Sequence, residues 1–282
     1  MQIDVHGQPA WCHRGGPPPD PARPTLVLVH GALNDHSVWQ RQADALARQG
    51  CAVLAPDLPG HGRSGGAALH SVEALADWLL DLLAQAGIER AVLAGHSMGA
   101  LVVLEAARRA PARMLGLTLH GLALLGAAFP MRVADPLLAR ARDDEAAAIE
   151  MVAAWSHADT AQVPAGAPAI IDEARALMQR LAARNPDRLL YTDLAACNGY
   201  AGGEAAAAAV SCPVTFVVGA KDRMTPPRAT ARLRAALPHA TLVEVDAGHA
   251  MLAEAPDAVL AALLDLAALA APAAPASPGA SR

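Results

Sequence analysis

Short apolar runs alternate with segments of helical spacing, and this alternation constrains the fold of the chain more than any other feature. The runs TLVLV (25–29), AVLAP (52–56) and AVLAG (91–95) are too short for helices and are rich in valine and leucine. Such runs are typical of strands buried on both faces of a parallel sheet. An amphipathic segment (71–88) lies between two of them, with Ser71 as its candidate N-cap. The alternation predicts βαβ units and therefore an α/β fold with a mostly parallel, doubly wound sheet.

The alternation stops after residue 126 and returns near residue 211. Between these points the pattern is helical and rich in alanine, with breaks at proline and glycine and no apolar run of the strand type. Strand-like runs resume with PVTFVVG (213–219) and ATLVEV (240–245). A helical insertion in one α/β domain explains this order most simply. We expect an α/β core at 1–126 and 211–270, a helical insertion at 127–210, and a disordered tail at 271–282.

Composition narrows the class of protein. Hydrophobic residues make up 54% of the chain and charged residues 17%, which fits a compact enzyme and argues against a disordered chain. The net charge is −5 and no cluster of lysine and arginine forms a basic stripe, so we expect no nucleic-acid partner. The four cysteines are scattered, without C-x-x-C or metal-ligand spacing, which fits a reduced, cytoplasmic setting.

Signals for targeting, membranes and cofactors are missing from the sequence. The N-terminal segment has no charged leader followed by an apolar run, so we expect no secretory signal. No apolar run reaches the roughly 18 residues of a membrane span without interruption, so we expect no membrane partner. Eleven histidines are present, but no H-E-x-x-H or similar pair occurs, and we expect neither a metal nor another cofactor.

The stretch GHSMG at 95–99 fits G-x-S-x-G, the pattern of a nucleophile elbow. A strand that turns sharply into a helix forces its central residue into an unfavourable backbone conformation. Glycines two positions before and after that residue relieve the collisions that side chains would cause. The following helix N-terminus favours developing negative charge. We therefore expect Ser97 to be a nucleophile rather than an ordinary turn serine.

A serine hydroxyl needs an adjacent base, and the base needs an orienting partner. The candidate base is His249, which follows a strand-like run and a glycine in VDAGHAML. The candidate acid is Asp222 in VVGAKDRM, because open parallel sheets place functional groups at the carboxyl ends of strands. Asp246 is its rival, but it lies close to His249 in sequence and is better explained as the end of its own strand. The order Ser97, Asp222, His249 is the order of α/β-hydrolases.

Acyl chemistry also needs two backbone N–H groups directed at the developing oxyanion. One should belong to Met98, directly after the candidate nucleophile. The other should come from the loop after the first buried strand, most simply from Ala32, with the neighbouring Leu33 as the alternative. Backbone donors leave the side chain almost free, so an ordinary strand-to-helix loop stays open as an explanation.

Five stretches together resemble the α/β-hydrolase fold superfamily over about residues 25–269: LVLVHGALNDHSVW, DLPGHGRS, GHSMGA, GAKDRMTP and GHAMLAEAPD. Within it, the chain is similar to small bacterial esterases and lactonases with a helical lid. The resemblance implies a lid at 127–210 over the pocket. It also implies a nucleophile, acid, base and two oxyanion donors at Ser97, Asp222, His249, Ala32 and Met98.

The resemblance also separates branches of this superfamily. Haloalkane dehalogenases and epoxide hydrolases use an aspartate nucleophile, whereas position 97 is a serine. The remaining class of reaction is acyl chemistry, in which Ser97 attacks a carbonyl, an acyl-enzyme forms, and water releases the acyl group. We expect a cytoplasmic serine hydrolase of small or medium carboxylic esters or lactones. The alternatives are an enol-lactone hydrolase, a carbon–carbon bond hydrolase, and a ligand-binding receptor with negligible turnover.

Side chains of the lid that face the candidate nucleophile should select the substrate. Flexible methionines adapt to varied ligands, and an aromatic content of only 3% argues against an aromatic cage. Packing of the lid helices on each other is the competing explanation for each apolar side chain. The expected substrate-binding residues are Leu33, Met131, Met151, Trp155, Cys197 and Asn198.

Overall fold

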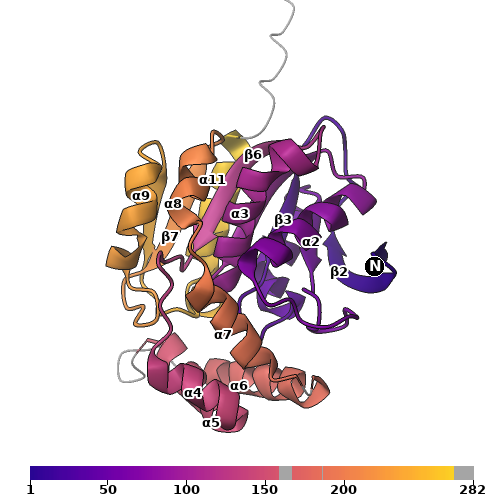
Figure 1. The fold of residues 1–282 in the computed structure, drawn as a ribbon. Helices are drawn as coiled ribbons and strands as arrows, with labels where there is room; N and C mark the ends of the chain where they lie inside the picture. Colours follow the sequence, from indigo (N-terminus) through magenta and orange to yellow (C-terminus); the bar gives the residue numbers. More distant parts are fainter. Residues whose placement is uncertain (159–166, 186, 270–282) are drawn as a thin grey trace, which may run out of the picture.

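A computed structural model describes residues 1–158, 167–185 and 187–269 of the chain. Its centre is an eight-stranded sheet with strand order β1-β2-β4-β3-β5-β6-β7-β8 (Figure 1). The strands are β1 (Gln2–Val5), β2 (Gln8–Gly15), β3 (Thr25–Val29), β4 (Val53–Pro56), β5 (Arg90–His96), β6 (Thr118–Leu125), β7 (Val214–Gly219) and β8 (Thr241–Val245).

Strands β4, β3, β5, β6, β7 and β8 pair with one another in parallel. The two antiparallel pairs are β1 with β2 and β2 with β4. Strands β3, β4 and β7 are buried at every residue. Because helices cover both faces of a parallel sheet, a central strand has no solvent-facing side, and its sequence shows no polar alternation. The predicted α/β fold with a mostly parallel sheet is confirmed.

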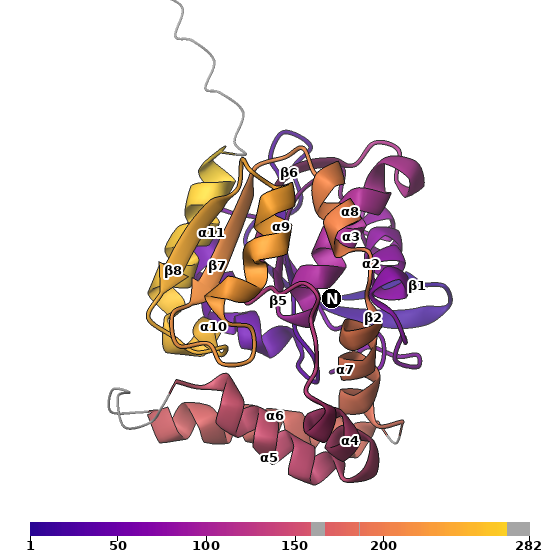
Figure 2. The same cartoon turned by 60° about the vertical axis from the view of Figure 1, so that its left-hand side comes forward.

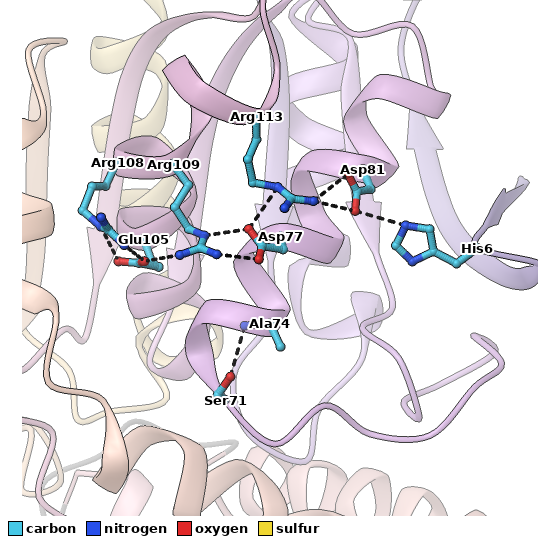
Figure 3. Close-up of polar contacts among 9 residues, drawn as sticks. All are labelled: His6, Ser71, Ala74, Asp77, Asp81, Glu105, Arg108, Arg109 and Arg113. Carbon is cyan, nitrogen blue, oxygen red and sulfur yellow. Dashed lines mark hydrogen bonds and ion pairs between the residues drawn. The ribbon is translucent and has the colours of Figure 1, made fainter.

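Helices pack on both faces of the sheet and form two separate apolar cores. One core joins a sheet face to α2 (Val72–Gln85) and α3 (Met98–Arg113), and the other joins the opposite face to α1 (Gln40–Arg48) and α11 (Pro256–Leu269) (Figure 1). Ser71 caps α2 as predicted, since its hydroxyl accepts the N–H of Ala74 at 3.1 Å (Figure 3). The remaining short helices of this region are η1 (His36–Trp39), η3 (Pro227–Thr230), α9 (Ala231–Ala236) and α10 (Met251–Glu254).

The described part of the chain between β6 and β7 contains helices α4 to α8, joined by loops, and no strand. Figure 2 shows α4 to α7 gathered at one end of the sheet, whereas α8 lies beside α3. Helices α4 to α7 share a third apolar core, which includes Leu137, Ile149 and Leu181. The helices are α4 (Asp135–Asp143), α5 (Glu145–Ser156), α6 (Ala167–Arg184), α7 (Leu189–Gly199) and α8 (Gly203–Ala209).

Helix α8 departs from the expected division of the chain into core and insertion. Helix α8 falls within the expected insertion 127–210, but it packs on α3 and α9 of the α/β core. We name helices α4–α7 the cap.

The expected disordered tail, 271–282, lies outside the described residues. Among the helices that the structure does describe, none combines the length and apolar character that crossing a bilayer requires.

Candidate active site

Ser97 occupies a sharp turn between the end of β5 and the start of α3. Its backbone angles are φ +55° and ψ −118°, in a region that residues with a side chain rarely adopt. Such strain persists only where the surrounding structure enforces it, and it is concentrated at functional sites. The turn therefore has the backbone geometry of a nucleophile elbow.

The glycines on either side of Ser97 are required by close backbone contacts. A Cβ on Gly95 would lie 2.1 Å from the carbonyl oxygen of Gly99, and a Cβ on Gly99 would lie 2.4 Å from that of Val29. Both distances are far below van der Waals contact. The expectation that glycine spacing relieves collisions at this turn is therefore confirmed for Gly95 and Gly99.

Three side chains from distant segments form one chain of hydrogen bonds. His249, in the loop after β8, has its Nε2 2.9 Å from Ser97 Oγ, and its Nδ1 lies 2.8 Å from Oδ2 of Asp222, in the loop after β7. Both His249 and Asp222 are 4% exposed. Because a carboxylate only accepts hydrogen bonds, Nδ1 carries a proton and Nε2 is free to accept the serine proton. The rival acid, Asp246, instead pairs with Lys221 at the surface.

Asp222 is held as a carboxylate by a dense set of donors. Its Oδ1 accepts the N–H groups of Met224 and Thr225, and its Oδ2 accepts the Thr225 hydroxyl, each at 2.8 Å. Burial acts to raise the pKa of Asp222, but the charge and hydrogen bond of His249 together with Thr225 lower it to about 2. Sequence reasoning missed Thr225, although a threonine three residues after an aspartate is the usual spacing for such a side-chain turn.

The loop that carries His249 is fixed from two sides. His96 donates from Nε2 to the carbonyl oxygen of His249 at 2.8 Å, and Glu254 accepts the Gly248 N–H at 2.6 Å. Glu254 also accepts the N–H of Ala158, at the end of the described part of the cap that follows α5. Burial, followed by the proximity of His249, lowers the pKa of His96 to about 3. His96 is therefore a neutral structural donor to the loop.

The loop after β3 carries the two candidate donors, Ala32 and Leu33. Ala32 lines the pocket beside Ser97, and no described residue accepts a hydrogen bond from its N–H. The N–H of Leu33, the alternative donor, is already used: Asp193 Oδ2 accepts it at 2.8 Å. Met98 is the first residue of α3, so its N–H has no partner within the helix. Of the two candidate donors in this loop, Leu33 has its N–H engaged by a described residue, and Ala32 does not.

A pocket of about 600 Å³ opens above Ser97 between the core and the cap. Its volume falls in the range of small-molecule sites. Its cap side is largely apolar, while the charged lining residues Arg41, Glu173 and Arg180 are exposed. The apolar lining residues from the cap include Val152, Leu177, Met178, Leu190 and Leu194.

None of the six expected substrate-binding residues is among the described residues that line this pocket, which corrects that part of the sequence interpretation. Leu33 is fully buried in the apolar core of the cap, and Met131 and Cys197 are buried in the core that includes α3. Asn198 accepts the N–H of Val133 and so ties two parts of the cap segment together.

Only one face of helix α5 lines the pocket, and the expected residues Met151 and Trp155 are not on it. Val152 and Ser156, one turn apart, line the pocket, whereas Met151 packs within the cap and Trp155 is 36% exposed. Neighbouring positions of a helix are rotated by about 100° from each other, so the two pairs lie on different faces. His157, at the end of α5, also lines the pocket and was not singled out from sequence.

One cluster, Asp35, His36 and Asp57, brings three groups within 4.8 Å of one another, close enough for a metal ion. Its groups are already engaged in protein hydrogen bonds. Asp57 Oδ1 lies 2.7 Å from His36 Nδ1 and accepts the His36 N–H, while Asp35 caps the turn at Ser37. These contacts give the cluster a structural explanation, as a clamp between the loops after β3 and β4.

Curated proteins resemble parts of the chain. It is 42% identical over 119 residues to the dihydrolipoyllysine-residue acetyltransferase component of the acetoin cleaving system of Pseudomonas putida, which covers 42% of this chain and 31% of that protein. It is 34% identical over 163 residues to Lipase LipV of Mycobacterium tuberculosis, covering 56% of this chain and 59% of that protein. The matches thus span less than two thirds of the length of either relative.

The fold likeness covers far more of the chain. The enol-lactonase from Burkholderia xenovorans LB400 superposes with a TM-score of 0.80 at 25% identity, over 94% of this chain and 99% of that one. A family model described as the alpha/beta hydrolase fold matches residues 24–256. These residues include the elbow at Ser97 and the loops of Asp222 and His249, so the model spans the whole candidate site. The chain belongs to the alpha/beta hydrolase fold family.

Proposed function

We propose that this protein is a serine hydrolase that cleaves small or medium-sized carboxylic esters through an acyl-enzyme on Ser97. The observation that carries the proposal is the hydrogen-bond chain Ser97–His249–Asp222 at the base of the pocket. Ser97 combines a strained backbone with a base within hydrogen-bond distance, and that base has its own carboxylate partner. This is the arrangement by which a hydroxyl becomes a nucleophile.

The reaction follows from these contacts. His249 Nε2 takes the proton of Ser97 Oγ as the oxygen attacks the ester carbonyl carbon, and the N–H groups of Ala32 and Met98 stabilise the oxyanion. Collapse of the tetrahedral intermediate breaks the bond to the alcohol, which leaves with the proton from His249. Water then attacks the acyl carbon as His249 accepts a proton from it. The acyl–Oγ bond breaks, the acid is released, and His249 returns the proton to Ser97 Oγ. Asp222 stays ionised and stabilises the imidazolium.

The cap serves as the lid in this proposal. Helices α5 to α7 supply the apolar side of the pocket, which fits an uncharged acyl chain. The exposed charges of Arg41, Glu173 and Arg180 stand where the leaving alcohol can remain partly solvated. An apolar wall with a few polar groups at the rim is typical of small-molecule sites.

Hydrolysis of p-nitrophenyl acetate and butyrate by wild type and Ser97→Ala tests the proposal. We expect turnover by wild type and a loss of about 10³-fold or more in kcat for the variant. Ser71→Ala is the matched control, because Ser71 caps α2 away from the pocket. Retained turnover in Ser97→Ala, or none in wild type across these esters, overturns the proposal.

A lactone is the second candidate substrate class, favoured by the likeness to the enol-lactonase over nearly the whole chain. Lactones undergo the same serine acylation, but the alcohol stays attached to the acyl group. Comparing kcat/KM for an enol-lactone with that for an open-chain ester of equal carbon number decides between them. A higher value for the lactone assigns the site to lactones.

A further inference from the structure

The loop that carries Ala32 is strained, and a cap residue holds it. Leu33 has φ +47°, a left-handed conformation that is unfavourable for a leucine by about 1 kcal/mol or more. Its side chain is fully buried, and its N–H donates to Oδ2 of Asp193 at 2.8 Å. Asp193 belongs to α7, 160 positions away in sequence. The cap thus contacts the backbone directly beside the proposed oxyanion donor.

Asp193 is in turn paired with His61, from the loop after β4. His61 Nε2 lies 2.8 Å from Asp193 Oδ2, and His61 Nδ1 lies 3.0 Å from the carbonyl oxygen of Pro59. Both neighbours are acceptors, so both ring nitrogens must carry a proton and His61 is an imidazolium. Burial acts to lower the pKa of His61, but the charge and hydrogen bond of Asp193 outweigh it and the pKa lies above its ordinary value.

This ion pair is an unusual choice for stability alone. The side chains of His61 and Asp193 are each 1% exposed, and Oδ1 of Asp193 has no hydrogen-bond partner among the described residues. A buried ion pair with an unpaired oxygen is often no more stable than apolar residues of the same volume. What the pair does provide is one fixed geometry between α7 and the loops after β3 and β4.

We propose that Asp193, held by His61, is a positioning residue that keeps Leu33 in its left-handed conformation and thereby aims the Ala32 N–H at the oxyanion. The inference rests on the proposed serine hydrolase function. In this proposal the oxyanion hole depends on the position of the cap. Asp193 lies on α7, the same helix that carries the pocket residues Leu190 and Leu194. A misplaced donor weakens binding of the transition state more than binding of the ester.

Kinetics of Asp193→Leu with p-nitrophenyl butyrate test this role. The variant keeps the branching at Cγ but removes the acceptor, and we expect kcat to fall about 10- to 100-fold with KM changed by less than about threefold. Affinity for an alkyl boronic acid, which forms a tetrahedral adduct on serine, should weaken by a similar factor. Asp193→Asn keeps an oxygen for the Leu33 N–H and should recover most of the lost kcat.

Glu105→Leu is the matched control. Glu105 is also a buried carboxylate that joins the core to the chain after α7, through the Tyr200 hydroxyl at 2.8 Å, but it does not touch the oxyanion loop. The Glu105→Leu variant should have a lower free energy of unfolding but an unchanged kcat. Should Asp193→Leu fail to fold, His61→Phe, which leaves Asp193 without its cation, is measured in its place and should lower kcat in the same way.

The outcomes separate the two proposals. Wild-type turnover that depends on Ser97, together with unchanged kcat in Asp193→Leu, overturns the positioning role and leaves the hydrolase function standing. An equal fall of kcat in Glu105→Leu also overturns it, because the effect would then follow general stability. Absence of Ser97-dependent turnover in wild type overturns both proposals.

Discussion

The backbone at Ser97 and the tautomer of His249 are the residue-scale features on which the proposed chemistry depends. The strained φ holds Oγ above the start of α3, and the Asp222 carboxylate keeps the proton on Nδ1 of His249. A second histidine, His96, lies beside them with its ring centre 4.9 Å from that of His249. Its Nε2 is committed to the backbone carbonyl of His249, whereas the hydrogen bond to Ser97 Oγ is made by His249 Nε2.

His249→Ala and His96→Ala should therefore behave differently. Loss of His249 removes the base, and we expect kcat for p-nitrophenyl butyrate to fall by about 10³-fold or more. Loss of His96 removes only a hydrogen bond that supports the loop, and the fall should stay within about tenfold. Steady-state kinetics with both purified variants give the comparison. The assignment of the base is wrong if His96→Ala loses as much activity as His249→Ala.

At the scale of elements, an ion-pair network joins α2 to α3 (Figure 3). Arg109 reaches Asp77 of α2 with two hydrogen bonds of 2.6 Å and also contacts Glu105. Arg113, one turn later, contacts Asp77 and Asp81 at 3.1 and 3.2 Å and is 40% exposed, against 26% for Arg109. The network ties the C-terminal half of α3 to α2, away from the end of α3 that carries Met98.

Arg109→Ala should lower the free energy of unfolding by about 1–3 kcal/mol, because it leaves the buried Glu105 with one cation fewer and removes a bidentate pair. Arg113→Ala is the matched control on the same helix. Its more exposed pairs should contribute less than about 1 kcal/mol. Urea denaturation of the three proteins measures the difference, and equal losses for both variants would contradict this ranking.

The sequence predicts the site residues that follow strands better than it predicts the pocket residues on the cap helices. Ser97, Asp222 and His249 could be predicted because each follows a strand of the parallel sheet, and parallel strands deliver their carboxyl ends to one edge of the sheet. The cap residues could not, because helical periodicity does not say which face of α5 meets the pocket. Met151 and Val152 are neighbours in sequence, and only the second lines it. Asp193 and His61 carry no local pattern at all, since their pairing is a tertiary contact.

Across the whole molecule, the sheet brings together segments that are far apart in the chain. The ends of β3, β5, β7 and β8 supply the loops of Ala32, Ser97, Asp222 and His249, while the cap closes the pocket above them. The sheet is built from runs that the sequence shows plainly. The contacts between cap and core combine apolar packing, such as that of Leu33, with hydrogen bonds to the carboxylates of Asp193 and Glu254, and both kinds connect segments far apart in the chain.

Covalent labelling of the full chain with a fluorophosphonate tests the central claim most directly, because the reagent reacts where a serine oxygen is activated and displaces fluoride from phosphorus. Peptide mass mapping should find the phosphonyl group on Ser97. Labelling should be absent in Ser97→Ala and slowed by about 10²-fold or more in His249→Ala. A label on another serine, or labelling of Ser97→Ala at the wild-type rate, would contradict the claim that these three segments converge to activate this hydroxyl.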